Sequence, residues 1–388
     1  MDALVEWYKA ERREIFNSQA IRNPGGVLMG CPIWGKSFVE RFGTYCLASI
    51  VGPKNLEALT GRCRLIVYTS EEDEVRLMSV LYPLAPWLDC SVRLIPSAVL
   101  EWEQEGEFNK YMILGAIQTL DVMRAARSQM GYHMLQPDHV FEEGYFANLF
   151  RLAEEHEAIT QISVSVDIEK AKDDLERYRC PDDKYLAIPG RDLGDIGWRH
   201  LHAQMRMYVM NDADIPERMP HSHFLLWQAR DHLRIHSVHH NAAWLSPAIC
   251  QRARFKGMGM IFGTMDTKLP RLLADTPIYM TGADDGMTFV ELSDESKKAA
   301  PNYVPALDFA IACHRSTMFH DEHDPYFNVP CTVPIEPRDT GMSDDEITAQ
   351  HNQVVDLLAS WKERAALVLL QAMYEGRVPF PVQTMVKE

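Results

Sequence analysis

The residues of this 388-residue chain best placed to do chemistry are polar side chains that follow short apolar segments. Asp138 is the first carboxylate after the segment 132–135, and Pro137 restricts the backbone just before it. A carboxylate in such a position can hold Mg²⁺ or Mn²⁺, which neutralises the charge of a departing diphosphate. We therefore predict that Asp138 binds a phosphate group directly or through a metal. The alternative is that Asp138 caps the next turn.

Three residues with polar or aromatic side chains, Tyr68, Thr69 and Ser70, stand at the end of the apolar segment 64–70. Tyr68 offers an aromatic face, and Thr69 and Ser70 offer hydroxyls, so a nucleotide base could stack and hydrogen-bond there. Asp73 follows closely and joins this predicted binding group. The alternative is that Ser70 caps a helix that begins directly after it.

Two later loops carry carboxylates that could act as a general base or bind sugar hydroxyls. Asp266 lies in the segment 263–268, and Asp284 and Asp285 lie in the segment 281–286. We predict Asp266 and Asp285 as the catalytic candidates. The alternative is that these carboxylates solvate turns.

Eight of the fifteen histidines fall between residues 200 and 240. His232 and His236 are four residues apart, as are His236 and His240, so on a helix they would share a face and could bind a metal. The alternation from Arg234 onward is instead typical of a strand, and no HExxH motif is present. Buried, hydrogen-bonded histidines are therefore the default expectation.

Composition excludes several function classes. The formal net charge of -16 argues against nucleic-acid binding. The sequence has no GxGxxG or GxSxG motif, which disfavours simple NAD or serine-hydrolase chemistry. The eight scattered cysteines indicate reduced, structural thiols. Without a basic and apolar leader or a run of about 20 apolar residues, we expect a soluble, cytoplasmic protein with no integral membrane segment.

Helices and strands must position these candidate residues, and the sequence patterns predict that helices and strands alternate along the chain. We predict helices over 2–17, 37–50, 108–130, 142–156, 167–179 and 344–375, and strands over 27–34, 64–70, 91–96, 132–135 and 158–166. Such alternation indicates an α/β fold with a mostly parallel sheet flanked by helices. Ligands of such sheets bind beyond the carboxyl ends of the strands.

Three regions follow from changes along the chain. We predict an α/β half over 1–180, a histidine-rich half over 181–330 and a helical tail over 331–388. The long C-terminal helix is predicted to mediate packing or assembly of a homo-oligomer.

The order of these segments resembles the GT-A fold of nucleotide-sugar glycosyltransferases, specifically a diffuse group of bacterial glycosyltransferase-like proteins. The resembling stretches span roughly residues 30–300 and are 34–39, 46–50, 52–56, 66–69, 109–111, 136–138, 239–242 and 263–269.

The resemblance implies that the half 1–180 is a Rossmann-like half that binds a nucleotide-sugar donor, and that the half 181–330 binds the acceptor. It places the base near Tyr68, Thr69 and Ser70, a metal on Asp138, and a further metal ligand at His240.

The sequence departs from the family pattern at two points. Where the family has Asp-x-Asp, this chain has Gln136-Pro137-Asp138, so one carboxylate is missing. In the segment 266–269, Lys268 stands where relatives often carry a second acidic residue. Use of a divalent metal is therefore an open question at this stage.

The resulting hypothesis is an enzyme that transfers a sugar from a nucleotide-sugar donor to an unknown acceptor. Lys110 would offset phosphate charge, Asp138 would support the diphosphate, and Asp266 or Asp285 would be the general base. Two alternatives are a metal-dependent enzyme that uses the histidine-rich region 200–240, and a non-catalytic protein that retains the fold.

Overall fold

The structure is a computed structural model that describes most of the chain. The described residues are 1–19, 22–106, 109–181, 184–206, 209, 224–237, 240–255, 264, 269, 273, 276–294, 329–339 and 343–377.

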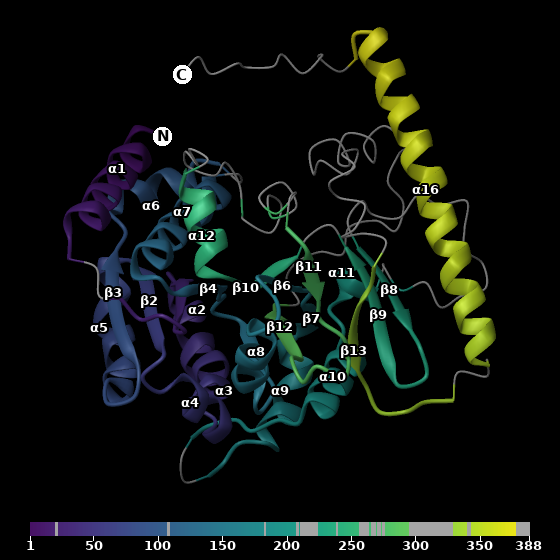
Figure 1. The fold of residues 1–388 in the computed structure, drawn as a ribbon, viewed down its shortest axis with the longest axis horizontal. Coiled ribbons are helices and arrows are strands. Elements are labelled where there is room, and N and C mark those ends of the chain that lie inside the picture. Colours follow the sequence, from purple (N-terminus) through teal and green to yellow (C-terminus); the bar gives the residue numbers. More distant parts are fainter. Residues whose placement is uncertain are drawn as a thin grey trace.

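A seven-stranded sheet forms the centre of the molecule, in the order β11-β6-β10-β4-β1-β2-β3 (Figure 1). Its strands are β1 (Val27–Pro32), β2 (Cys63–Thr69), β3 (Asp89–Leu94), β4 (Gly131–Met134), β6 (Ala158–Gln161), β10 (Asn241–Leu245) and β11 (Ile278–Met280). Neighbouring strands are parallel except that β10 runs antiparallel to both β4 and β6. This confirms the predicted α/β class with a mostly parallel sheet.

Helices cover both faces of the sheet, as Figure 1 shows. One face packs against α1 (Asp2–Asn17), α6 (Ser97–Gln104), α7 (Asn109–Ser128) and α12 (Pro247–Phe255). The other packs against α2 (Lys36–Arg41), α3 (Leu47–Ile50), α4 (Pro53–Leu59), α5 (Glu71–Leu81) and α8 (Tyr145–Ala153). The sheet is therefore the middle of three layers.

Burial on both faces explains the composition of the central strands. All six residues of β1 are buried, and β2 is buried at six of its seven positions. Continuous apolar strands of this kind are typical of parallel sheets covered by helices. At Gly30, an added Cβ would lie 1.7 Å from an Asp121 carboxylate oxygen, so the absent side chain is what lets α7 approach β1.

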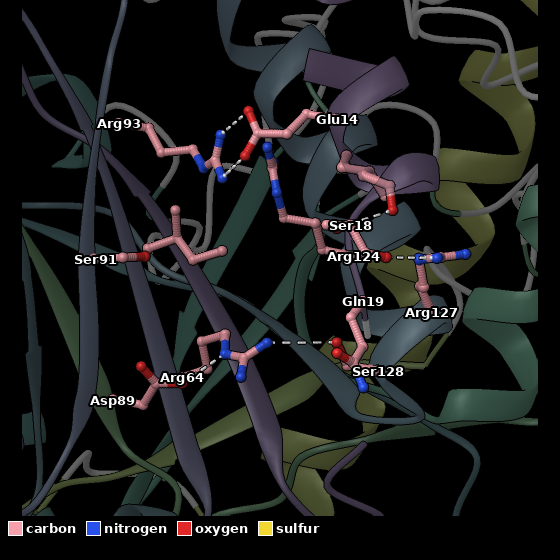
Figure 2. Close-up of a pocket in the computed structure, with 12 residues that line it drawn as sticks. Glu14, Ser18, Gln19, Arg64, Asp89, Ser91, Arg93, Arg124, Arg127 and Ser128 are labelled. Atoms are coloured by element: carbon pink, nitrogen blue, oxygen red, sulfur yellow. Dashed lines mark hydrogen bonds and ion pairs between the residues drawn. The ribbon is translucent and has the colours of Figure 1, made fainter. Parts of the chain in front are cut away.

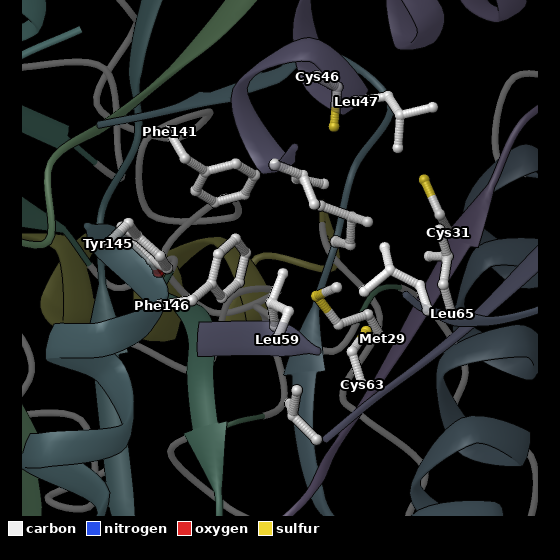
Figure 3. Close-up of a cluster of buried hydrophobic side chains, with 14 of the residues drawn as sticks. Met29, Cys31, Cys46, Leu47, Leu59, Cys63, Leu65, Phe141, Tyr145 and Phe146 are labelled. Carbon is white, nitrogen blue, oxygen red and sulfur yellow. The ribbon is translucent and has the colours of Figure 1, made fainter. Parts of the chain in front are cut away.

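The core between the sheet and α2–α5 contains cysteine side chains among aliphatic and aromatic ones (Figure 3). Burial raises the pKa of the Cys31, Cys46 and Cys63 thiols well above the ordinary value. The seven cysteines that the structure describes are all free.

Two smaller sheets and further helices extend the fold beyond the central layers. The sheets are β5-β12-β7 and β13-β9-β8, built from β5 (His139–Phe141), β7 (Val164–Asp167), β8 (Phe224–Gln228), β9 (His232–Ser237), β12 (Phe289–Ser293) and β13 (Cys331–Pro334). The remaining helices are α9 (Ile168–Glu176), α10 (Gly190–Arg199), α11 (Ala203–Arg206) and α16 (Asp344–Tyr374). Two short helical turns are η1 (Phe42–Cys46) and η2 (Tyr82–Leu84). β10 and β11 come from the part of the chain after residue 180 and join the central sheet. The division into regions at residue 180 stays a prediction.

Several predicted elements differ from the structure in detail. The helix expected over 37–50 is interrupted by the π-helical turn η1, and the strand expected over 158–166 divides into β6 and β7. The predicted C-terminal helix is confirmed as α16, whose first turn is closed by a capping box between Ser343 and Glu346. In the part of the chain that the structure describes, no helix is long and apolar enough to cross a membrane.

Candidate functional site at the carboxyl ends of β1 and β4

A pocket of about 90 Å³ opens where β1 and β4 end. We call it the edge pocket. Its lining residues come from β1 and the loop after it, from α2, from the first turns of α7 and from the loop after β4: Pro32, Trp34, Phe38, Lys110, Leu114, Gln136, Pro137 and Asp138. The structure thus brings the predicted phosphate ligands Lys110 and Asp138 into one pocket.

The aromatic wall of the edge pocket is held by hydrogen bonds from two other elements. The Trp34 indole nitrogen donates to a Glu103 carboxylate oxygen at 3.2 Å. The next residue, Gly35, has φ of +88° and donates its backbone N–H to Asp73 at 2.7 Å. Glycine suits this backbone conformation because it has no Cβ. The loop after β1 is thereby fixed with the indole beside the pocket.

The cationic wall comes from α7. The Lys110 ammonium lies 5.1 Å from the centre of the Phe38 ring, a cation–π distance, and both side chains line the pocket. Lys110 is half-buried, so its charge is partly shielded from water without being lost to the interior. It provides a positive charge opposite the loop that carries Asp138.

The loop after β4 is anchored on both sides of Asp138. The Cys46 thiol donates to the Gln136 carbonyl at 3.4 Å, and the backbone N–H of Leu292 donates to the Asp138 carbonyl at 2.8 Å. Pro137 is buried while the Asp138 side chain is half-buried. A half-buried carboxylate on an anchored loop can meet a ligand with little loss of conformational entropy.

Tyr68 and Thr69, the predicted base-binding residues, have completely buried side chains in this structure. The Tyr68 hydroxyl donates to Asp121 and accepts from Arg124 beneath α1 and α7. Burial also raises the pKa of Tyr68 well above its ordinary value. The ring therefore presents no surface on which a base could stack.

Ser70 and Asp73 have local roles. The Ser70 side chain accepts the backbone N–H of Asp73 at 3.2 Å and caps α5, which confirms the alternative interpretation of that serine. Asp73 is 4% exposed and accepts hydrogen bonds from Ser70 and Gly35. Asp73 thus positions the loop after β1, and it does not line the edge pocket.

His240 lies directly before β10, and its two ring nitrogens already have protein partners. One is 2.9 Å from the Ser237 carbonyl and the other 3.2 Å from the Thr160 hydroxyl. Among the described residues, no group of three or more His, Cys, Asp or Glu side chains is arranged to hold a metal ion. The predicted pairing of Asp138 with His240 on one metal gains no support from these contacts.

The structure describes one of the two predicted catalytic residues, Asp285, and does not describe the other, Asp266. The Asp285 carboxylate accepts the Tyr279 hydroxyl at 2.9 Å and the Gly282 backbone N–H at 2.6 Å, so it closes the turn after the edge strand β11. It is not among the residues that line the edge pocket. Asp266 lies outside the described residues.

The histidine-rich region contains strands, as its alternation indicates. His232 and His236 lie on β9, which rules out the helical arrangement of these two residues. His200 contacts Asp174 at 2.7 Å, and His232 contacts Asp231 at 2.8 Å. These pairs, together with the complete burial of His236, fit structural histidines. His221, His223 and His239 lie outside the described residues.

Sequence reasoning assigned no binding role to Trp34 or Phe38, the aromatic residues of the edge pocket. Trp34 is the first aromatic residue after β1, and it directly precedes a glycine. That position, beyond the end of a buried strand, is the signal that could have identified it.

Comparisons with known proteins give no sequence relative and distant structural neighbours. No family model and no curated sequence matches the chain. Similar solved structures include S. aureus TarS (10% identity, TM-score 0.25), mannosyltransferase PcManGT from Pyrobaculum calidifontis with GDP-Man and Mn²⁺ (10%, 0.37), and GalNAc-T7 with UDP, GalNAc and Mn²⁺ (11%, 0.39).

The extent of these matches varies. The aligned part covers 36% of this chain and 36% of TarS, 97% of this chain and 85% of PcManGT, and 78% of this chain and 50% of GalNAc-T7. The match thus spans about a third of TarS and half of GalNAc-T7. Since these three TM-scores are below 0.5, the candidate site rests on the topology and contacts of this chain.

Proposed function

We propose that this chain is a glycosyltransferase that binds a nucleoside-diphosphate sugar at the edge pocket and transfers the sugar to an acceptor. The observation that carries the proposal is the place of the pocket in the sheet. β1 has β2 on one side and β4 on the other, so the connections diverge between β1 and β4. Ligands of open α/β sheets bind at such switch points, beyond the carboxyl ends of the strands.

The residues of the pocket suit the parts of such a donor. Lys110 supplies positive charge for a diphosphate, and the Trp34 indole supplies a flat surface for a base or a sugar ring. Asp138 can accept hydrogen bonds from hydroxyl groups of the donor. Small-molecule pockets usually measure about 300–1,000 Å³. The donor would therefore extend beyond the 90 Å³ enclosed by the described lining residues.

The proposed transfer forms one bond and breaks another. An acceptor oxygen or nitrogen attacks the anomeric carbon of the sugar, and the bond from that carbon to the diphosphate oxygen breaks. The electron pair leaves with the nucleoside diphosphate, whose growing charge the Lys110 ammonium stabilises. A general base takes the proton of the acceptor. We assign this role to Asp266, because the contacts of Asp285 place it in a turn at the edge of the sheet.

The proposed site offers one carboxylate, that of Asp138, to a divalent ion. Mg²⁺ is commonly held by one or two carboxylates together with substrate phosphates, and Asp138 is a half-buried carboxylate on the pocket wall. Asp138 would hold the ion, which when bound would add positive charge at the diphosphate. His240 is left out of this set because both ring nitrogens are already engaged.

A binding and turnover experiment tests the proposal. The full chain is titrated with UDP-, GDP-, CMP- and TDP-sugars, with Mn²⁺ or with EDTA, while binding heat and donor hydrolysis are measured. We expect saturable binding of one donor class that weakens in Asp138→Asn. Binding without hydrolysis would favour a non-catalytic protein that retains the fold, and no binding of any donor would overturn the proposal.

We also propose that α16 mediates homo-oligomer formation. Near its C-terminal end, Leu367, Leu370 and Tyr374 are 66%, 60% and 88% exposed. Their spacing of three and four residues places them on one face of the helix. An exposed apolar stripe of this kind on a helix is typical of a helix-pairing surface.

A further inference from the structure

A second, larger pocket lies between the sheet and the helices α1 and α7, with a volume of about 280 Å³. We call it the arginine pocket. Figure 2 shows its side chains arranged around a common space. The lining residues come from α1 and its C-terminal end, from along β2 and β3, and from the last two turns of α7: Glu14, Ile15, Ser18, Gln19, Arg64, Ile66, Asp89, Ser91, Arg93, Arg124, Arg127 and Ser128.

The arginine pocket lies away from the edge pocket. Arg64 and Asp89 stand at the beginning of β2 and β3, whereas the edge pocket lies at the carboxyl ends of β1 and β4. One helix reaches both pockets, because α7 contributes Lys110 to the edge pocket and Arg127 to the arginine pocket. A helix of 20 residues is about 30 Å long. The two pockets are therefore separate sites on one rigid element.

Positive charge dominates the lining of the arginine pocket. Four guanidinium groups line it against two carboxylates, those of Glu14 and Asp89. Both carboxylates are more than half exposed, at 53% and 59%. The whole chain carries a formal charge of -16, so four guanidinium groups on one lining contrast with the sign of the protein, although Glu11 and Asp121 behind the lining pair with Arg93 and Arg124. A concave surface with one sign of charge concentrates ions of the other sign.

Ion pairs with glutamates of α1 fix two of the four arginines in place. Arg93 donates to Glu14 at 2.8 Å and to Glu11 at 3.1 Å, and Arg124 donates to Glu11. The side chain of Arg124 is 9% exposed, and that of Glu11 is 13% exposed. These pairs form one rigid wall of the pocket.

The other two arginines keep unused donors. Arg64 donates through Nε to Asp89 at 2.7 Å and through Nη1 to Ser128 at the long distance of 3.5 Å. Arg127 donates through Nη2 to the Ser18 carbonyl at 2.6 Å, while its buried Nε–H has no hydrogen-bond partner among the residues that the structure describes. A buried donor without a partner costs free energy.

We propose that the arginine pocket binds a small molecule that carries a phosphate group. Guanidinium groups match the oxygen geometry of phosphate through paired N–H donors, and Arg64 and Arg127 provide such donors. The hydroxyls of Ser91 and Ser128 add neutral donors on the same lining. Ile15 and Ile66 are buried apolar residues of the lining, which suits a ligand with a small organic body. The volume lies near the lower end of the range for small-molecule sites.

The test measures binding of pyrophosphate and inorganic phosphate to the full chain by calorimetry, at constant ionic strength. The double variant Arg64→Gln/Arg127→Gln should raise the apparent Kd at least tenfold. Because these substitutions remove contacts to Asp89 and Ser18, a second variant, Ser91→Trp, fills the pocket from an exposed position and leaves the ion pairs in place. It should weaken binding to a similar extent.

Two controls separate this site from general charge and from the edge pocket. Arg12→Gln/Arg13→Gln removes the same charge from exposed positions of α1 and should leave the Kd within twofold. Ser91→Trp should weaken pyrophosphate binding at the arginine pocket. Lys110→Gln, a change in the edge pocket, should leave that binding unchanged. Unaltered pyrophosphate binding in Ser91→Trp would overturn the proposal, as would equal loss in the Arg12/Arg13 control or the absence of binding to the unmodified protein.

Discussion

The edge pocket and the arginine pocket use charge in opposite ways. At the edge pocket, Lys110 and Asp138 are half-buried side chains on separate elements, and the carboxylate belongs to a loop anchored by backbone contacts. At the arginine pocket, Arg93 and Arg124 are already paired with carboxylates. The first arrangement offers two opposite charges for a reaction with a leaving group. The second offers a rigid surface that binds an anion without a group to transform it.

The largest effect should come from the proposed general base. Asp266→Asn should lower the rate of sugar transfer about 10²- to 10⁴-fold, because the acceptor proton then has no base. Donor binding at the edge pocket and pyrophosphate binding at the arginine pocket should remain. Initial rates with saturating donor measure the first effect, and calorimetry measures the other two.

Two further substitutions accompany that measurement. Asp284→Asn changes an exposed aspartate of the turn after β11 and serves as a matched control that should retain full activity. Asp285→Asn distinguishes the two candidate bases. A loss of transfer in Asp285→Asn with normal rates in Asp266→Asn would assign the base to Asp285 and contradict our assignment.

Removal of the positive charge from the edge pocket should have a smaller effect. Hydrogen bonds to charged groups contribute about 1.5–3 kcal/mol. Lys110→Gln should therefore weaken donor binding about 10- to 100-fold, while Arg64→Gln should leave donor binding unchanged. Donor titrations of both variants measure the difference. If Arg64→Gln weakened donor binding as much as Lys110→Gln, the two pockets would not be separate sites.

The contributions of Glu142 and Glu14 to the free energy of unfolding should change with pH in opposite directions. Near the loop of the edge pocket, burial raises the pKa of Glu142 from its ordinary value to about 7, although Thr288 donates to its carboxylate at 2.9 Å. The folded state then holds this proton where the unfolded state releases it. The contribution of Glu142 to the free energy of unfolding should therefore fall as pH rises from about 4.5 to about 7.

At the arginine pocket, the hydrogen bond from Arg93 lowers the pKa of Glu14. Its contribution to stability should be present above the ordinary pKa and be lost as pH falls through the lowered one. Exposure to solvent screens this pair and keeps the effect small. Urea unfolding of Glu142→Gln between pH 4.5 and 7, and of Glu14→Gln below pH 4.5, measures both effects. A steeper decline for Glu142→Gln between pH 4.5 and 7 would contradict the account.

The smallest effect on either pocket should come from α16. Leu367→Glu/Leu370→Glu places charges on the exposed stripe, so we expect the oligomer to dissociate while donor and pyrophosphate binding persist. Light scattering coupled to size-exclusion chromatography measures the mass. Gln371→Glu, an exposed position on the same helix, is the matched control. A monomeric unmodified protein would refute the proposed role of α16.

The sequence predicted the sheet well because its central strands are apolar on both faces and have clear ends. The position of Asp138 follows from one such end, since Pro137 marks where β4 must stop. For Tyr68, the sequence pattern did not predict whether the side chain is buried or exposed. It lies two residues before Ser70, and only the packing of α1 and α7 over that face of β2 reveals that its ring is buried.

The arginine pocket could not be predicted from the sequence for a related reason. Arg64, Arg93 and Arg127 are far apart along the chain and occupy no recognisable motif. The parallel register of β2 with β3 and the approach of α7 bring them together. Contacts of this kind depend on tertiary packing, which local patterns do not encode.

A crystal structure of the full chain soaked with the nucleotide-sugar that binds most tightly would test the central claim most directly. We predict that the diphosphate lies against Lys110 at the carboxyl ends of β1 and β4, with Asp138 on a donor hydroxyl or on a divalent ion. Clear density for the nucleotide at another place, including the arginine pocket, with the edge pocket empty, would contradict the account.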